Sequence, residues 1–375
     1  MPIHEVRRLA GARLASGAAD AALPVTLAYL VLLRWHGTAT QLGLVLAAPV
    51  AGHFLARMVQ LPWPYRRVML ASNLASAALP VAVAALGSRS FAALAGLLLW
   101  RGFSSAFFTP AAQALGGRIL APRWRALVGL LPAVPVVLAP LLGYGILTAF
   151  GPAGGLALDA GLLLLSAGMV AWIGPGERPT DAHTPSRTGV SQAIPAIAVL
   201  FAVNLCAAGP LLTVVPASLS VLGYAVVLSA IGAGVVAGSV LCGLVRIRGG
   251  LSRAMLWLVP ATAGPLALVL RAPLAVIAVA FAVVGIVQSV HSVLTARGLG
   301  PAAALEETGS LAVLPVGQVL GGLAFDHLGF TATAWLIVAA LCGLPLLPAG
   351  RSPRPRTRPG TTDIRTASMA SAGSR

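Results

Sequence analysis

Residues 91–112 read FAALAGLLLWRGFSSAFFTPAA, an uncharged run interrupted near its centre by Arg101. A run of this length can cross the hydrocarbon core of a bilayer as one helix. A charge at the centre of such a helix costs at least ~2.5 to 3.5 kcal/mol on insertion scales, so it normally faces a polar cavity or an acidic partner. Elsewhere, only Asp20 and Asp159 are acids lying well inside apolar runs. Arg101 therefore predicts either a transport pathway or a structural ion pair between helices.

The composition predicts an integral membrane protein. Of the 375 residues, 58% are apolar and 9% are charged. Soluble domains average about 45 to 50% apolar residues and about 25% charged residues. All 25 basic residues are arginine, so the lysine of a phosphate-binding P-loop is missing and an ATP-driven pump on this chain alone is excluded. The arginines that give the chain its net charge of +16 lie mostly between the apolar runs. This distribution indicates membrane topology rather than nucleic-acid binding.

The apolar runs predict an all-α polytopic membrane protein with twelve transmembrane helices. Their continuous hydrophobicity favours helices over barrel strands. Arg13 and Asp20 within the first run favour an uncleaved first span over a signal peptide. The predicted spans are 9–33, 40–58, 67–86, 90–115, 126–149, 153–174, 193–218, 222–245, 254–270, 273–295, 308–325 and 330–348.

The loop arginines predict the orientation of these spans. If the spans alternate, only Arg34, Arg89 and Arg271 fall on one side, and all the other loop arginines fall on the opposite side. The positive-inside rule then places both termini in the cytoplasm. The predicted units are a six-helix bundle over 1–174, a cytoplasmic linker over 175–192, a second six-helix bundle over 193–349 and a disordered tail over 350–375.

Several stretches carry a family resemblance. They are VRRLAGARLASGAADAALP (6–24), TQLGLVLAAPVAG (40–52), RRVMLASNLASA (66–77), FFTPAAQAL (107–115), ALDAGLLLLSAG (157–168) and, in the second half, GGLAFDHLG (321–329). Together they resemble the drug and siderophore exporter branch of the major facilitator superfamily, in particular macrolide-efflux-like and enterobactin-exporter-like permeases. The resemblance implies two six-helix domains and proton-coupled export through a rocker-switch cavity.

The chain departs from the family pattern at the gate between helices two and three. The usual motif is G-x-x-x-D-R with a basic pair soon after it. Here Gly52 and Arg57 fit the motif, but Ala56 replaces the acid, and Arg66 and Arg67 come late. The G-P-x-x-G-G pattern of helix five is also altered, since only its proline and one glycine remain, at Pro140 and Gly143.

Asp20, Arg101 and Asp159 are the predicted proton-coupling residues. Counted at 1.5 Å per residue from the outer end of each span, Arg101 lies about 15 Å deep and Asp20 about 20 Å deep, so the two side chains can meet. Asp159 lies about 10 Å deep and is the second choice of partner. The alternative is that Asp20 has only a structural role, as a cap or an ion-pair partner of helix four.

Further polar and aromatic residues in the spans could line a substrate cavity, although an interhelical hydrogen bond or simple packing is the commoner reason for such residues in a helix bundle. These candidates are Trp100, Phe103, Phe107, Asn204, Gln288 and His291. A cytoplasmic gate is predicted from basic residues of the first half and the only adjacent acids of the chain, which are Arg57, Arg66, Arg67, Arg118, Glu306 and Glu307. The two glutamates could instead only complement the dipole at the start of helix eleven.

These features predict a multi-pass transporter of the cell membrane that exports a small hydrophobic or cationic compound in exchange for protons. An importer of the same fold and a membrane enzyme or scaffold are the alternatives. An enzyme is not favoured, because no H-E-x-x-H motif, no carboxylate pair near a histidine and no cysteine cluster occurs. No metal, cofactor or nucleic-acid partner is expected, and a monomer is the expected state. The sequence does not specify the substrate.

Overall fold

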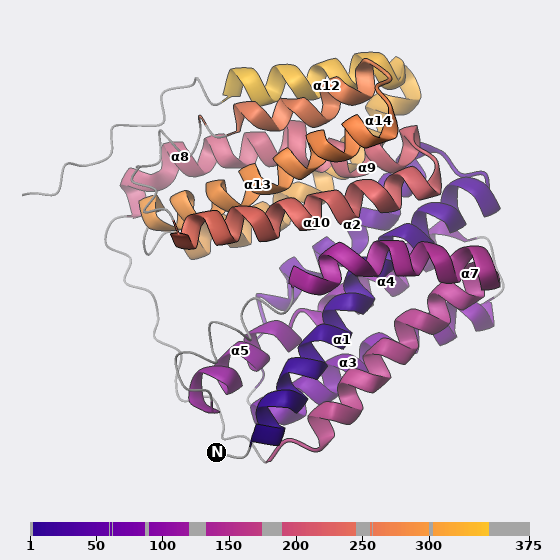
Figure 1. The fold of residues 1–375 in the computed structure, drawn as a ribbon, viewed down its shortest axis with the longest axis vertical. Coiled ribbons are helices and arrows are strands. Elements are labelled where there is room, and N and C mark those ends of the chain that lie inside the picture. Colours follow the sequence, from indigo (N-terminus) through magenta and orange to yellow (C-terminus); the bar gives the residue numbers. More distant parts are fainter. Residues whose placement is uncertain are drawn as a thin grey trace, which may run out of the picture.

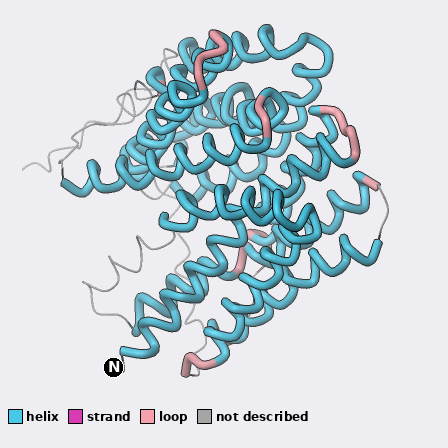
Figure 2. Tube along the Cα trace, turned by 45° about the vertical axis from the view of Figure 1, so that its right-hand side comes forward, coloured by secondary structure: helices cyan, strands magenta, loops and turns pink. Residues whose placement is uncertain are grey.

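The computed structural model describes residues 3–59, 61, 63–86, 90–119, 133–174, 190–244, 256, 258–299 and 303–344. These residues are helical apart from short connections (Figure 2), which confirms the prediction of an all-α chain. Most of the predicted linker, the whole predicted tail and the beginning of the fifth predicted span lie outside the described residues.

The helices follow one another with few intervening residues. Those of the first half are α1 (Ile3–Ala28), the π-helical turn η1 (Tyr29–Arg34), α2 (Ala39–Ala56), α3 (Tyr65–Leu86), α4 (Phe91–Ser105), α5 (Phe108–Ile119) and α7 (Ala133–Ala171). Those of the second half are α8 (Val190–Val203), the π-helical turn η2 (Asn204–Ala208), α9 (Gly209–Ser218), α10 (Val221–Leu244), the 3₁₀ turn η3 (Val259–Thr262), α12 (Ala263–Val269), α13 (Leu274–Leu299) and α14 (Ala303–Gly343).

Eight helices of the described residues are long and apolar enough to cross a membrane. Two of them, Val134–Ala171 and Glu306–Gly343, have 38 residues each, or about 57 Å of helix against about 30 Å of hydrocarbon. Each consists of two helices joined at a glycine with positive φ, Gly151 (φ 68°) and Gly329 (φ 79°). Glycine adopts this left-handed conformation without the steric penalty of a Cβ atom.

Local sequence explains where two of the helices start and how a third accommodates proline. Thr38 and Gln41 form a reciprocal capping box at the start of α2, and Ser90 accepts a hydrogen bond from the backbone N–H of Ala93 at the start of α4. Because Pro210 has no backbone N–H to donate, the helix widens in the turn before it, and η2 is the π-helical segment that results. A wider turn of this kind lets a helix continue past proline.

The helices gather into two groups, α1 to α7 and α8 to α14, which come together at one end (Figure 1). The groups meet mainly through two helix pairs, α2 with α14 and α7 with α10, and to a smaller extent through α2 with α9 and α1 with α10. The end where α1 begins and α2 finishes is called the near end below, and the opposite end, which holds Thr38 and Gly329, is called the far end.

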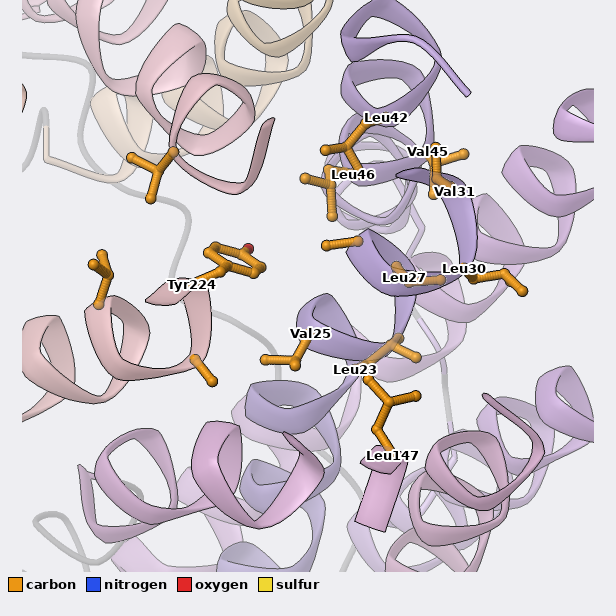
Figure 3. Close-up of a cluster of buried hydrophobic side chains, with 14 of the residues drawn as sticks. Leu23, Val25, Leu27, Leu30, Val31, Leu42, Val45, Leu46, Leu147 and Tyr224 are labelled. Atoms are coloured by element: carbon orange, nitrogen blue, oxygen red, sulfur yellow. The ribbon is translucent and has the colours of Figure 1, made fainter. Parts of the chain in front are cut away.

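One apolar core joins the two groups at the far end. It combines Val25 and Leu46 of the first group with Tyr224 and Phe281 of the second, and Tyr224 points toward Val25 and Leu46 (Figure 3). At the near end the described apolar residues form separate clusters, one around Leu9 in the first group and one reaching Leu299 in the second. Among the described residues, the groups therefore share a core only at the far end.

Small residues let α2 and α14 approach closely toward the far end. A Cβ atom added to Gly43 would collide with the backbone oxygen of Gln318, and one added to Gly322 would collide with the backbone of Ala39 and Thr40. Small residues commonly allow this approach between membrane helices. The contact fixes the far end of the interface through the backbone.

Candidate functional site

Arg101 of α4 binds two carboxylates that come from two other helices. Its Nη1 lies 3.0 Å from Oδ1 of Asp20 on α1, and its Nη2 donates a hydrogen bond of 2.7 Å to Oδ1 of Asp159 on α7. The structure thus brings together all three residues that the sequence suggested for coupling. Both candidate acids, rather than one of them, lie against the guanidinium.

The two acids differ sharply in exposure. The side chain of Asp159 is 1% exposed and that of Arg101 is 4% exposed, whereas that of Asp20 is 50% exposed. A buried charge needs a partner because losing one leaves an uncompensated charge in a poorly solvated site. Asp159 therefore neutralises Arg101 inside the bundle, and Asp20 is the half-exposed member of the cluster.

A set of hydroxyl and amide groups holds the helices around this cluster. Ser104 donates a hydrogen bond of 3.0 Å to the carbonyl of Arg101 and shares one of 2.8 Å with Ser76 of α3. Asn73 of α3 donates to Oγ of Ser166 on α7 at 2.7 Å, and Ser166 in turn donates to the carbonyl oxygen of Ala12 on α1 at 2.8 Å. These bonds tie α3 to the three helices that carry the cluster.

The aromatic candidates lie on another face of α4. Helical geometry turns Trp100 by about 100° and Phe103 by about 160° from Arg101. Their rings are stacked 6.0 Å apart, and Phe103 meets Phe107 edge to face at 5.4 Å. Trp100 is also about half exposed. The structure thus does not bring these rings together with the charged cluster.

The polar candidates of the second half are scattered. Asn204 donates to Oγ of Ser310 at 2.9 Å, and Ser310 donates to Oε1 of Glu306 at 2.8 Å. Gln288 is exposed, and His291 lies 3.4 Å from Thr295 on the same helix. Asn204 thus bonds to α14, whereas Gln288 and His291 lie on α13.

The predicted gate residues separate into different contacts. Arg57 at the end of α2 forms an ion pair with Glu307 of α14, whereas Glu306 turns to Ser310. Arg66 donates to the carbonyl of Ala171 at 2.7 Å. Arg67 is exposed, and the side chain of Arg118 lies outside the described residues. Of the predicted set, Arg57 and Glu307 are brought together across the two groups of helices.

Asp326 was missed by the sequence analysis, although it lies in the quoted stretch GGLAFDHLG. It accepts hydrogen bonds from the backbone N–H groups of Ala39 at 3.1 Å and Thr40 at 2.9 Å, and from the hydroxyl of Thr40 at 2.6 Å. The first N–H groups of a helix have no partner within it, and a negative charge is favourable there. An acid of the second group thus caps a helix of the first, at the far end.

Lysine in place of arginine at position 101 tests how the cluster uses the guanidinium. The two terminal nitrogens of Arg101 each contact a carboxylate on a different helix. The ammonium group of lysine is a compact point charge that lacks this forked geometry. Because hydrogen bonds to charged groups contribute about 1.5 to 3 kcal/mol, the coupling role predicted from the sequence leads us to expect that Arg101→Lys lowers the transport rate by about tenfold or more. The measurement is the initial rate in vesicles, normalised to inserted protein. Near-normal rates would mean that a bare positive charge suffices.

The fold has counterparts among solved structures. A POT family transporter in complex with 5-aminolevulinic acid aligns with a TM-score of 0.73 and 11% identity over 91% of this chain and 94% of that chain. The nucleoside transporter NupG aligns with a TM-score of 0.70 and 13% identity, covering 91% and 98%. A D-xylose-proton symporter aligns with a TM-score of 0.68 and 14% identity, covering 92% and 95%.

Sequence comparison alone finds no relatives: no protein-family model matches the chain, and no curated protein matches it. The similar solved structures are transporters rather than enzymes. At these identities the likeness concerns the fold. The chain is therefore a multi-pass membrane protein that shares the fold of these transporters.

Proposed function

We propose that the chain is a proton-coupled secondary transporter that exports a small hydrophobic or cationic compound by alternating access. In this proposal, residues 1–174 and 193–349 are six-helix bundles, 175–192 is a cytoplasmic linker, and both termini, including the tail 350–375, are cytoplasmic. The described residues hold eight candidate spans. In this proposal, α7 and α14 each cross the membrane twice, which makes ten crossings, and α3 and α12 supply the other two of the twelve. The near end then faces the cytoplasm, in agreement with the positive-inside rule.

The double ion pair of Arg101 is the observation that carries this proposal. One positive and two negative side chains give the cluster an excess of one negative charge when all three are ionised. An excess charge inside a membrane protein favours the binding of one compensating cation. The half-exposed Asp20 offers the site for it, because Asp159 is buried against Arg101.

Competition for Asp20 would couple the two fluxes. A proton on Asp20 neutralises the cluster and weakens its attraction for a cationic substrate, and a bound cationic substrate disfavours the proton in the same way. Two ligands that exclude each other at one carrier site are exchanged when the site opens alternately to each side. The exporter-like stretches of the first half support outward movement of the substrate.

Flux into inverted vesicles tests the proposal. Candidate substrates come first from a susceptibility screen of toxic compounds in a pump-deficient host that expresses the chain. Inverted vesicles should then accumulate the compound when their lumen is acidic, and a protonophore should abolish the accumulation. Flux that is unaffected by the protonophore would contradict proton coupling.

Symport into the cell is a second candidate, because a D-xylose-proton symporter shares the fold and a fold does not fix the direction of transport. The same compound would then enter right-side-out vesicles when the outside is acidic. Export predicts that an acidic outside drives the compound out of such vesicles, so the direction of flux under one gradient separates the two candidates.

Alternating access requires that the contacts at both ends break in turn. At the far end, the apolar core and the Asp326 cap hold the two groups of helices together. At the near end, the pair that joins the groups among the described residues is Arg57–Glu307, which is exposed, and exposed pairs contribute only about 0.2 to 1 kcal/mol. We assign the structure to a state that is closed toward the outside and that keeps this single weak ion pair across the near end.

Removing the charge of Asp326 should shift the protein toward the state that is open at the far end. Replacing a capping side chain by alanine costs about 0.5 to 2 kcal/mol, so Asp326→Ala should change the ratio of the two states by about two- to thirty-fold. Double electron–electron resonance between spin labels on cysteines introduced at His36 and Thr331, in an otherwise cysteine-free protein, measures the distribution of distances across the far end. His327→Ala is the matched control, since it alters the neighbouring residue but leaves the cap. An unchanged distribution in Asp326→Ala would rule out the cap as a latch.

A further inference from the structure

An apolar groove runs along the surface of the first group of helices, between α1 and both segments of α7. Its walls include Gly11, Leu14 and Ala18 of α1 and Leu138, Leu142 and Leu162 of α7, and it encloses about 370 Å³. A second hollow of about 580 Å³ shares Leu165 and Met169 with it and adds Arg8 and Trp172. The two hollows form one groove that is apolar along its length and charged at the near end.

The groove faces lipid rather than the interface between the two groups of helices. Gly232 of α10 packs against the backbone of Val136 on α7. Leu138 follows Val136 by two residues and is therefore turned by about 200° from it. Leu138, Leu142 and Leu165 are each more than half exposed, which in a membrane-spanning segment means contact with acyl chains.

The near end of the groove is built to receive an anion. Arg8 donates a hydrogen bond of 2.6 Å to the carbonyl of Trp172, and its guanidinium lies 5.9 Å from the centre of the indole ring. Arg66 donates to the neighbouring carbonyl of Ala171 at 2.7 Å. Glu5, one turn before Arg8, lies against Gly174 and offsets one of these charges. A net positive charge remains at the helix end.

We propose that this groove binds an anionic phospholipid, with an acyl chain along α1 and α7 and the headgroup phosphate at Arg8. The groove is long enough for an acyl chain. Its wall on α7 includes Gly168 and extends from Trp172 to Leu162, which is about 15 Å at 1.5 Å per residue. Tryptophan is enriched at membrane interfaces, and Trp172 is 72% exposed. Basic sites between membrane helices recognise anionic headgroups by charge. The proposal does not depend on what the chain transports.

Brominated lipids offer a direct test on the full-length protein, because bromine on an acyl chain quenches nearby tryptophan fluorescence. The protein is reconstituted with brominated phosphatidylglycerol or brominated phosphatidylcholine, and the Trp172 signal is obtained as the difference between wild type and Trp172→Phe. We expect phosphatidylglycerol to be preferred at Trp172 by about fivefold, which is the effect of one basic side chain near an anionic headgroup.

Two independent changes should abolish this preference. Arg8→Gln removes the charge at the headgroup, and Gly168→Leu fills the groove, since a Cβ atom added at Gly168 meets no other heavy atom within 4 Å. Each has a matched control. Arg7→Gln removes an exposed arginine that does not line the groove, and Gly161→Leu adds the same side chain to the same face of α7, outside the groove.

The outcomes separate clearly. Equal quenching by both lipids in the wild type overturns the proposal. A preference that survives both Arg8→Gln and Gly168→Leu in monodisperse protein places the lipid elsewhere and also overturns it. Loss of the preference in these two variants, with retention in Arg7→Gln and Gly161→Leu, assigns the lipid to the groove.

Discussion

Replacing Asp20 by asparagine is expected to abolish proton-coupled transport in a protein that still folds and inserts. The amide keeps the size of the side chain but cannot carry the negative charge that a proton or a cationic substrate would neutralise. Arg101 keeps its buried partner Asp159 in this variant, so the bundle is not left with an unpaired charge. We expect proton-driven flux to fall to the level of empty vesicles.

Asp159→Asn is the matched comparison, because it removes the other carboxylate from the same guanidinium. Here Arg101 loses its buried partner, and breaking a buried pair typically costs about 3 to 5 kcal/mol. We expect lower thermal stability and lower yield in addition to lost transport, whereas Asp20→Asn should keep both near wild type. Thermal unfolding and gel filtration of the two variants measure the difference. Full proton-dependent transport by Asp20→Asn would eliminate Asp20 as the coupling acid.

The sequence predicted the charged cluster because few charges lie inside its apolar runs. One arginine and two acids leave few possible pairs, and burial makes pairing necessary. The order of preference between the acids could not be predicted from depth. The guanidinium lies several ångströms from its own Cα atom, so the small differences in depth counted along helices did not separate Asp20 from Asp159, and both bind Arg101.

Contacts that depend on tertiary structure were beyond the sequence. Asp326 lies at the end of a long apolar run, and nothing local shows that its partners are the N–H groups of Ala39 and Thr40. Asn73 and Ser166 pair across two helices in the same way. The glycines of GGLAFDHLG carried a weak signal, because Gly322 marks the close approach that brings α14 onto the start of α2.

The adjacent acids at the start of α14 illustrate a similar limit. Consecutive residues on a helix point about 100° apart, so Glu306 and Glu307 cannot face the same partner equally. The structure directs Glu307 to Arg57 across the two groups of helices and Glu306 to Ser310 within the second. The prediction of a gate treated them as one unit, and the geometry restricts the proposed latch to a single pair.

A charge exchange between Arg57 and Glu307 is therefore the sharpest test of the proposed cytoplasmic latch. Glu307→Arg places two positive charges where the ion pair was, so the near end should open and export should fall severalfold. Arg57→Glu in the same protein restores an ion pair of opposite sense, and we expect it to recover much of the lost rate. The readouts are flux in inverted vesicles and the spin-label distance across the near end.

Two controls distinguish a latch from a general effect of charge. Arg66→Glu changes net charge as Arg57→Glu does, but Arg66 contacts the carbonyl of Ala171 and should not rescue Glu307→Arg. Glu306→Arg removes the acid that accepts from Ser310 and should not be rescued by Arg57→Glu. If Glu307 only complements the helix dipole, worth about 0.3 to 1 kcal/mol, then Arg57→Glu cannot restore function, and failure of the exchanged pair in well-expressed protein would exclude the latch.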